Sequence, residues 1–132
     1  MPKGAVPAQY HDILQSTALG HVATTDAEGR PEVNPLWFIW DGEHILLSIK
    51  GETRKHRNLR RDPRIAISFS DLNDPERYLE IRGEVIAFTP YETLDFVNEL
   101  AHKYTGEDFK HGYAGQERYK LTVRVDSWTA QN

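Results

Sequence analysis

The chain has 132 residues, of which 39% are hydrophobic and 27% are charged, and its formal net charge is -4. These values are ordinary for a soluble globular protein, so we expect residues 1–132 to form one domain. The negative net charge argues against a general nucleic-acid binder, because non-specific affinity depends on the phosphates that basic side chains neutralise. No apolar run approaches the roughly 20 residues that span a bilayer, so no membrane insertion is expected.

The chain contains no cysteine, which removes disulfides and thiolate chemistry from consideration. The first residues lack the apolar segment of a secretory signal, so the expected location is the cytoplasm. The six histidines show neither H-x-x-x-H nor H-E-x-x-H spacing, and no metal site is predicted. They are His11, His21, His44, His56, His102 and His111.

Six segments alternate between apolar and polar residues with the period of two that is typical of half-buried strands. They are Ala18–Thr25, Glu32–Trp40, His44–Lys50, Arg64–Ser70, Tyr78–Phe88 and Tyr119–Val125. The turn at 26–31 and the hairpin signal at 41–42 predict that the first three form a meander. The second segment is apolar on both sides, so both of its faces are expected to be covered. Gly83 interrupts the fifth segment and indicates a bulge.

Three segments are predicted to be helical. The first covers residues 8–16. The second follows Thr53, a suitable N-cap, and must end before Asp62-Pro63, because the residue before proline avoids the helical region. The third opens with the capping-box pattern Thr89, Pro90 and Glu92 and extends to about Tyr104. Six strands with few short helices predict a mainly β fold, an antiparallel barrel-like sheet with peripheral helices.

The stretch from Arg54 to Arg64, which includes the second helical segment, concentrates six basic side chains in eleven residues. They are Arg54, Lys55, Arg57, Arg60, Arg61 and Arg64. The chain holds 16 Lys and Arg against 20 Asp and Glu, so removing these six and Asp62 leaves 10 basic and 19 acidic residues. One interpretation is a solvated helix surface. The other is a phosphate site, where the helix N-terminus, the Thr53 hydroxyl and the first two basic side chains converge.

Three runs in this order make the chain resemble a known family. They are G-R-P-E-V-N-P-L-W-F-I-W-D-G-E-H-I-L-L-S-I-K, then T-R-K-H-R-N-L-R-R-D-P-R-I-A-I-S-F, then Y-L-E-I-R-G-E-V. They resemble the split-barrel flavin-binding proteins related to pyridoxamine 5'-phosphate oxidase, and more closely the branch that uses the deazaflavin coenzyme F₄₂₀. The later run K-Y-T-G-E-D is also similar to that branch. The resemblance covers roughly residues 19–83 and implies a six-stranded antiparallel split β-barrel.

The resemblance also implies where a cofactor binds. The phosphate is expected where the third strand meets the short helix, and the matching residues are Ser48, Ile49, Lys50, Thr53, Arg54 and Lys55, with Asn58 further along the helix. The ring system is expected along the second strand, at Asn34, Pro35, Leu36 and Trp37. Trp37 also fits a core position, which is the commoner role of a large aromatic residue in a strand.

Family members are homodimers with cofactor sites at the subunit interface, and Tyr78 resembles a position that reaches the neighbour's site. F₄₂₀ carries a phosphodiester followed by a glutamate tail, so further cations beyond Lys55 fit its anionic length. Whether Arg57, Arg60 and Arg61 contact that tail, or pair with acids of the protein, stays open at this point.

The implied activity is an F₄₂₀-dependent oxidoreductase that transfers a hydride from the reduced cofactor to a conjugated or quinone-like small molecule. The protein's tasks are then to hold the ring, align the acceptor and exclude water, and no catalytic side chain is assigned. One alternative keeps the fold but uses FMN, as an oxidoreductase or a flavin-binding protein. Another is a non-catalytic binding module. Pyridoxamine phosphate oxidation is not expected, because that enzyme's basic C-terminal substrate motif cannot be located.

Overall fold

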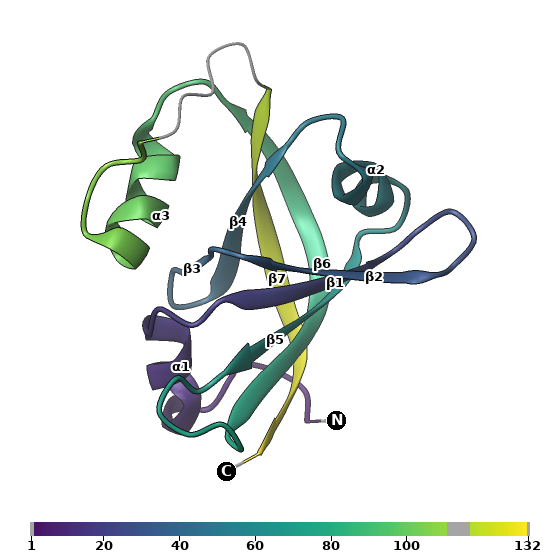
Figure 1. The fold of residues 1–132 in the computed structure, drawn as a ribbon. Helices are drawn as coiled ribbons and strands as arrows, with labels where there is room; N and C mark the ends of the chain where they lie inside the picture. Colours follow the sequence, from purple (N-terminus) through teal and green to yellow (C-terminus); the bar gives the residue numbers. More distant parts are fainter. Residues whose placement is uncertain (1, 111–116, 132) are drawn as a thin grey trace.

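The computed structural model describes residues 2–110 and 117–131. Seven strands form one antiparallel sheet that curls strongly on itself (Figure 1). They are β1 (Gly20–Thr25), β2 (Pro31–Leu36), β3 (Ile39–Trp40), β4 (His44–Lys50), β5 (Arg64–Ser70), β6 (Tyr78–Tyr91) and β7 (Arg118–Gln131). The helices are the 3₁₀ turn η1 (Ala8–Tyr10), α1 (His11–Gln15), α2 (Arg54–Arg61) and α3 (Asp95–Thr105). The predicted mainly β fold with peripheral helices is confirmed.

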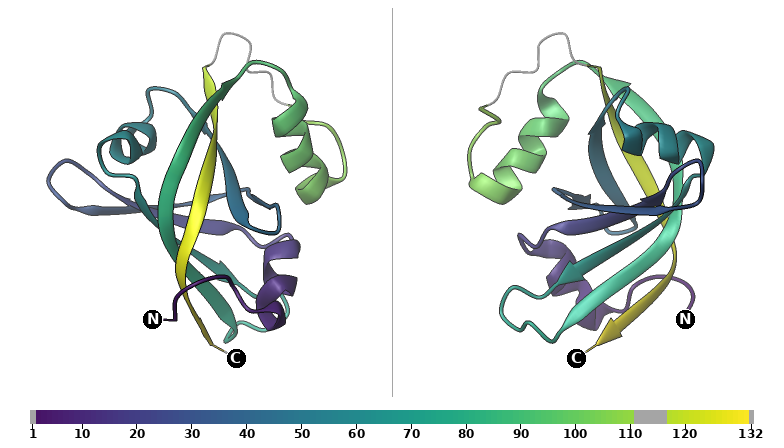
Figure 2. Two further views of the ribbon diagram at one scale, coloured as in Figure 1. Left: turned by 180° about the vertical axis from the view of Figure 1, so that it is seen from behind. Right: turned by 45° about the vertical axis from the view of Figure 1, so that its right-hand side comes forward.

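The strand order explains the curl. It is β2-β1-β5-β6-β7-β4-β3, so β2 and β3 lie at opposite ends of the order although only Trp37 and Phe38 separate them in sequence. The two ends must therefore approach each other, as they do in a split barrel. Figure 2 shows that α2 and α3 flank β6 and β7 on opposite sides.

The predicted single strand over Glu32–Trp40 and the three-stranded meander are wrong. The strand breaks at Phe38, whose side chain is fully buried in the core and whose backbone N–H donates to the Tyr104 hydroxyl at 3.2 Å. The prediction that both faces of this segment are covered is also wrong within the single chain. Val33 is 62% exposed, and Asn34 and Pro35 are exposed as well.

The core follows the predicted alternation. Its side chains lie on one face of the strands and include Ile45, Leu47, Ile49, Ile65, Ile67, Phe69, Leu79, Ile81, Leu121 and Val123. The Phe38 and Phe69 rings pack with centroids 4.6 Å apart. Helix α1 adds Ile13 and Leu14 to this cluster, and α2 adds Leu59. The core thus occupies the inside of the curled sheet and leaves the basic part of α2 outside.

The predicted third helix begins later than its sequence pattern indicates. Residues 89–91 continue β6, where Thr89 and Tyr91 pair with Lys120 and Arg118 of β7, and α3 starts only at Asp95. The capping box is therefore wrong, because ladder hydrogen bonds to β7 satisfy this backbone instead. Among the described residues, no helix is long and apolar enough to cross a membrane.

Gly83 lies at the bulge that its sequence position predicts. The register between β6 and β7 shifts between Arg82 and Gly83, which are opposite Ser127 and Val125. A Cβ atom built on Gly83 would lie 1.7 Å from the carbonyl oxygen of Arg124. Only glycine therefore lets the two backbones approach this closely.

We expect the substitution Gly83→Ala to lower the free energy of unfolding by about 1 to 3 kcal/mol, because the backbone of β7 has to move away from the added methyl group. Urea denaturation followed by circular dichroism measures this change. Ile86→Ala, at a half-exposed position of the same strand, serves as the control and should change stability by less than about 1 kcal/mol. An unchanged denaturation midpoint for Gly83→Ala would contradict the prediction.

Candidate functional site

A groove of about 680 Å³ lies between β2, the end of β4 and the start of α2. Nine of the twelve predicted cofactor-binding residues line it: Asn34, Pro35, Leu36, Ser48, Ile49, Lys50, Thr53, Arg54 and Lys55. Glu32 and Arg118 complete the lining. One part of the groove is apolar and the other is basic, and its volume lies in the range of small-molecule sites.

The turn between β4 and α2 sets the basic part of the groove. Thr53 is the N-cap of α2, as predicted: its Oγ1 accepts from the His56 backbone N–H at 3.2 Å. The Thr53 hydroxyl donates to the Lys50 carbonyl at 3.0 Å, so its proton is used within the turn. Glu52 has a φ of 64° and is the only non-glycine residue with a positive φ among those described. Such left-handed backbone costs energy and often marks a functional turn.

Glu32 places a carboxylate beside these cations. Arg54 Nη1 lies 3.8 Å from Glu32 Oε1. Burial lowers the pKa of the half-buried Lys55 ammonium, and the Glu32 carboxylate acts in the opposite direction. Burial thus disfavours the charged ammonium of Lys55, whereas a nearby anion, such as the Glu32 carboxylate, favours it.

The sequence reasoning missed Glu32 and Arg118. Glu32 alternates with Asn34 along β2, and this period of two could have placed it on the same face. Arg118 is opposite Lys50 in the β4–β7 ladder. Because that pairing joins segments far apart in sequence, no local signal reveals it.

Three predicted residues lie outside the groove. The Trp37 ring stacks on Tyr104 with centroids 5.2 Å apart and a 5° interplanar angle. Asn58 is 3% exposed, and its Nδ2 donates to Thr24 Oγ1 at 3.2 Å and to Glu32 Oε1 at 3.4 Å. Tyr78 begins β6, opposite Gln131, whereas the groove is near the other end of that strand. Within one chain, Tyr78 does not contribute to the groove.

The chain matches the family described as pyridoxamine 5'-phosphate oxidase over residues 6–131. It belongs to this family. Its structure is similar to that of an F₄₂₀ reductase, with 34% sequence identity and a TM-score of 0.87 over 94% of this chain and 98% of the other. The resemblance to this superfamily and its F₄₂₀ branch, inferred from sequence, is therefore confirmed.

More distant solved structures share the fold. A conserved hypothetical protein from Mycobacterium tuberculosis has 20% identity and a TM-score of 0.73, covering 98% of this chain and 86% of its own. HupZ from Group A Streptococcus has 16% identity and a TM-score of 0.67, covering 96% and 94%. The curled antiparallel sheet is consistent with the predicted split barrel, although it has seven strands rather than the predicted six.

The groove has the chemistry that a flavin-type molecule requires. Its apolar side includes Pro35, Leu36 and Ile49, which suit a planar ring, and its basic side includes Arg54 and Lys55, which suit a phosphate. Ser48 lies between the two, and its hydroxyl hydrogen-bonds the Tyr91 hydroxyl. The described residues contain no group of three or more His, Asp or Glu side chains that could hold a metal, and His111 lies outside them.

Lys103 and Tyr104 of α3 fix the break that ends the groove's β2 strand. Lys103 Nζ donates to the Phe38 carbonyl at 2.9 Å and lies 3.6 Å from the centroid of the Phe38 ring. The Tyr104 hydroxyl donates to the Ala18 carbonyl at 2.8 Å. Burial lowers the pKa of Lys103 to about 8 and raises the pKa of Tyr104 to about 12. The K-Y pair of the K-Y-T-G-E-D run therefore supports the fold next to the groove.

We expect Tyr104→Phe to lower the free energy of unfolding by about 1 to 3 kcal/mol, because the Ala18 carbonyl and the Phe38 N–H lose a partner in a half-buried place. Chemical denaturation measures the loss. Tyr78→Phe, a half-buried tyrosine at the far end of β6, provides a matched control for removing a hydroxyl. Equal stabilities of the two variants would show that the Tyr104 hydroxyl does not hold the break.

Proposed function

We propose that the protein is an F₄₂₀-dependent oxidoreductase that transfers a hydride to a conjugated or quinone-like small molecule. The observation that carries this proposal is the single groove, which joins an apolar wall to a basic end and contains nine of the residues that the family resemblance implies. The 34% identity to an F₄₂₀ reductase, over nearly the whole of both chains, supports F₄₂₀ over other cofactors.

The residues divide into two tasks. Lys50, Arg54 and Lys55 hold the anionic arm by charge-assisted hydrogen bonds at the start of α2. Asn34, Pro35 and Leu36 hold the ring along β2, where the Asn34 amide can both donate and accept. When bound in its reduced form, F₄₂₀ supplies a hydride from C5 of its deazaflavin ring. The chain contributes orientation and exclusion of water, and no side chain is assigned as an acid or base.

Binding of FMN is the second candidate, because the family is described by an enzyme class that uses this cofactor and the basic end of the groove suits any flavin phosphate. An absorption spectrum of the purified protein, followed by titration of apoprotein with F₄₂₀ and with FMN, distinguishes the two. We expect tighter binding of F₄₂₀. Tighter binding of FMN would transfer the proposal to that cofactor, and affinity no better than millimolar for either would favour a non-catalytic binding module.

We further propose that the active form is a cytoplasmic homodimer. Val33, 62% exposed on β2 beside the groove, supports a subunit interface there, because a second subunit would remove its side chain from water. Tyr78, distant from the groove in its own chain, would then be available to the partner's groove. Sedimentation velocity should give a species of twice the 15.2 kDa chain mass.

Lys55→Ala should weaken cofactor binding by about 1 to 3 kcal/mol, which is the scale of a lost charge-assisted contact. Fluorescence titration with F₄₂₀, or with FMN if that is the bound cofactor, measures the change. Arg82→Ala, which removes an exposed cation paired with Glu80 at 3.2 Å, is the control for a general change in charge and should leave the affinity unaltered. Unchanged affinity in Lys55→Ala would show that the phosphate binds elsewhere.

A further inference from the structure

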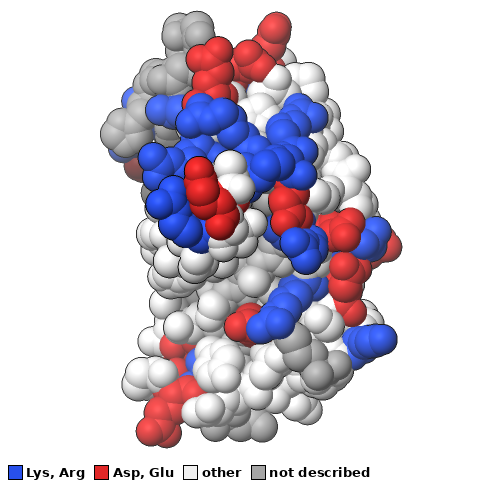
Figure 3. Space-filling view, turned by 90° about the vertical axis from the view of Figure 1, so that its right-hand side faces the viewer, with Lys and Arg blue, Asp and Glu red and all other residues white. Residues whose placement is uncertain are grey.

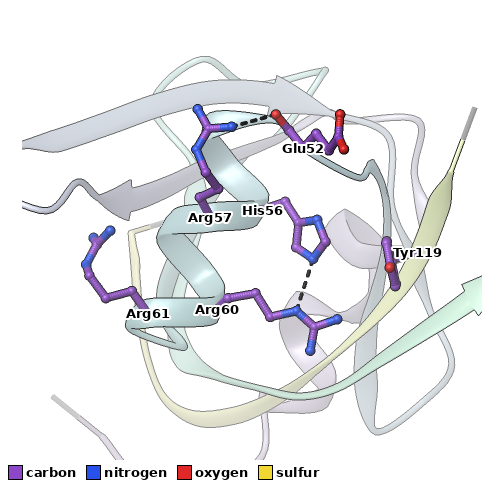
Figure 4. Close-up of a pocket in the computed structure, with 6 residues that line it drawn as sticks. All are labelled: Glu52, His56, Arg57, Arg60, Arg61 and Tyr119. Atoms are coloured by element: carbon purple, nitrogen blue, oxygen red, sulfur yellow. Dashed lines mark hydrogen bonds between the residues drawn. The ribbon is translucent and has the colours of Figure 1, made fainter.

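A second hollow, of about 820 Å³, lies against α2 and β7 (Figure 4). Its lining consists of Glu52, His56, Arg57, Arg60, Arg61 and Tyr119. None of these residues lines the groove, whose cations from α2 are Arg54 and Lys55. The basic helix therefore presents two separate cationic surfaces rather than one.

Uncharged groups hold the three arginines of the second hollow in place. Arg57 Nη1 donates to the Glu52 carbonyl at 2.6 Å, and Arg61 Nη2 donates to the Thr25 carbonyl. Arg60 Nε donates to His56 Nε2 at 3.0 Å, and the Arg60 guanidinium lies 4.0 Å from the centroid of the Phe88 ring. Figure 4 shows the contacts from Arg57 and Arg60. These contacts orient the side chains without neutralising their charge.

The contrast with other arginines of the chain is sharp. Six of them form ion pairs with carboxylates: Arg30, Arg54, Arg64, Arg77, Arg82 and Arg124. Within residues 2–110 and 117–131, no ion pair is formed by Arg57, Arg60 or Arg61, although the chain has four more acidic than basic residues. A solvated helix face in an acidic protein has carboxylates available, and this one uses none of them.

The charge of the hollow is clearly positive. Three arginines and the single carboxylate of Glu52 give a formal charge of +3 - 1 = +2 for its lining. Burial and the neighbouring Arg60 lower the pKa of His56, while the Glu117 carboxylate acts in the opposite direction. Glu117 does not line the hollow, but its carboxylate accepts the hydrogen bond of the Tyr119 hydroxyl. Figure 3, which faces the side of the molecule that carries α2, shows Lys and Arg gathered over its upper part.

We propose that this second hollow is an anion site for an oligoanion, a molecule that carries two or more phosphate or carboxylate groups. Arg57, Arg60 and Arg61 follow one another at the i, i+3 and i+4 spacing that places side chains on one flank of a helix. Planar guanidinium groups bind phosphate and carboxylate in a bidentate manner, and three of them exceed the needs of a single anion. The lining of this hollow shares no residue with the lining of the groove.

Two sources could supply this chemistry: a free polyphosphate or polycarboxylate, and the carboxylate tail of a cofactor anchored in the groove. Pyrophosphate is the probe for the site itself, and F₄₂₀ samples that differ in the number of tail glutamates are the probe for the second source. If the tail is the occupant, affinity rises with tail length and Arg57→Gln removes the rise. If a free oligoanion is the occupant, pyrophosphate binds equally well with the groove saturated by F₄₂₀ or FMN.

Isothermal titration of the full chain with pyrophosphate, with orthophosphate for comparison, tests the proposal. We expect pyrophosphate to bind more tightly than orthophosphate, and Arg57→Gln and Arg60→Gln each to weaken it roughly tenfold. Glu52→Gln should instead tighten it, because it removes the only negative charge of the lining. Arg57 is the primary variant, since its side chain is exposed and its guanidinium hydrogen-bonds the Glu52 backbone carbonyl.

Two further variants separate this site from the groove and from general charge effects. Lys55→Ala should weaken any binding of pyrophosphate to the basic end of the groove but leave unchanged the binding that Arg57→Gln weakens, and it weakens cofactor binding if the proposed function is correct. Arg82→Gln should change neither. The proposal is overturned if Arg57→Gln and Arg60→Gln bind pyrophosphate as the unmodified chain does, if Lys55→Ala alone weakens it, or if Arg82→Gln weakens it equally. Failure of cofactor binding with retained pyrophosphate binding would overturn only the proposed function.

Discussion

Both cationic surfaces depend on which side of α2 is packed against the core. Leu59 is fully buried in the core, and Asn58, 3% exposed, donates to Thr24 of β1. Successive helical residues are about 100° apart, so burial of Asn58 and Leu59 leaves Arg57, Arg60 and Arg61 exposed, while Lys55, next to the buried side, lines the groove beside β2. A helix of eight residues with five basic side chains would not be stable alone, and its packing onto the barrel holds it.

The start of α2 carries charges of the wrong sign for a helix N-terminus. That end of a helix favours anions, yet the first turn of α2 contains no acidic residue and begins with Arg54 and Lys55. The left-handed backbone of Glu52 and the half-buried ammonium of Lys55 add to this local cost. A bound phosphate would offset these terms together, because it meets the helix N–H groups and both cations at one point. Local conflicts of this kind are expected where a protein binds a ligand.

Features that depend on neighbouring residues could be predicted from the sequence. The alternation in β4 and β5 identified their buried faces, and Thr53 was recognised as an N-cap because the motif is complete within four residues. The features that were missed depend on distant contacts. The break at Phe38 needs the hydroxyl of Tyr104, 66 residues away, and the extension of β6 through Tyr91 needs the ladder with β7. Residues 89–91 pair with β7 instead of forming the helix start that the local capping pattern predicts.

The same distinction applies to the candidate site. Thr53, Arg54 and Lys55 follow one another, so a strand followed by a capped helix was enough to predict that they meet, whereas Ser48, Ile49 and Lys50 entered through the family resemblance. Asn34 to Leu36 entered through the family resemblance, and only the curled sheet explains why they face the same groove. The polar side chain of Asn58 is typical of a binding residue, but its burial is typical of a residue that stabilises the fold. Its position one residue before Leu59 is what turns its amide toward Thr24.

Two prolines in β2 limit how a second subunit can contact the open side of the groove. β2 lies at one end of the strand order, and Pro31 and Pro35 provide no backbone N–H along it. Proline protects an edge strand from pairing with strands of other molecules. A subunit that covers this side therefore has to pack against side chains such as the exposed Val33, rather than extend the sheet. Contact of that kind would leave the groove lining free for a ligand while a second subunit covered the open side.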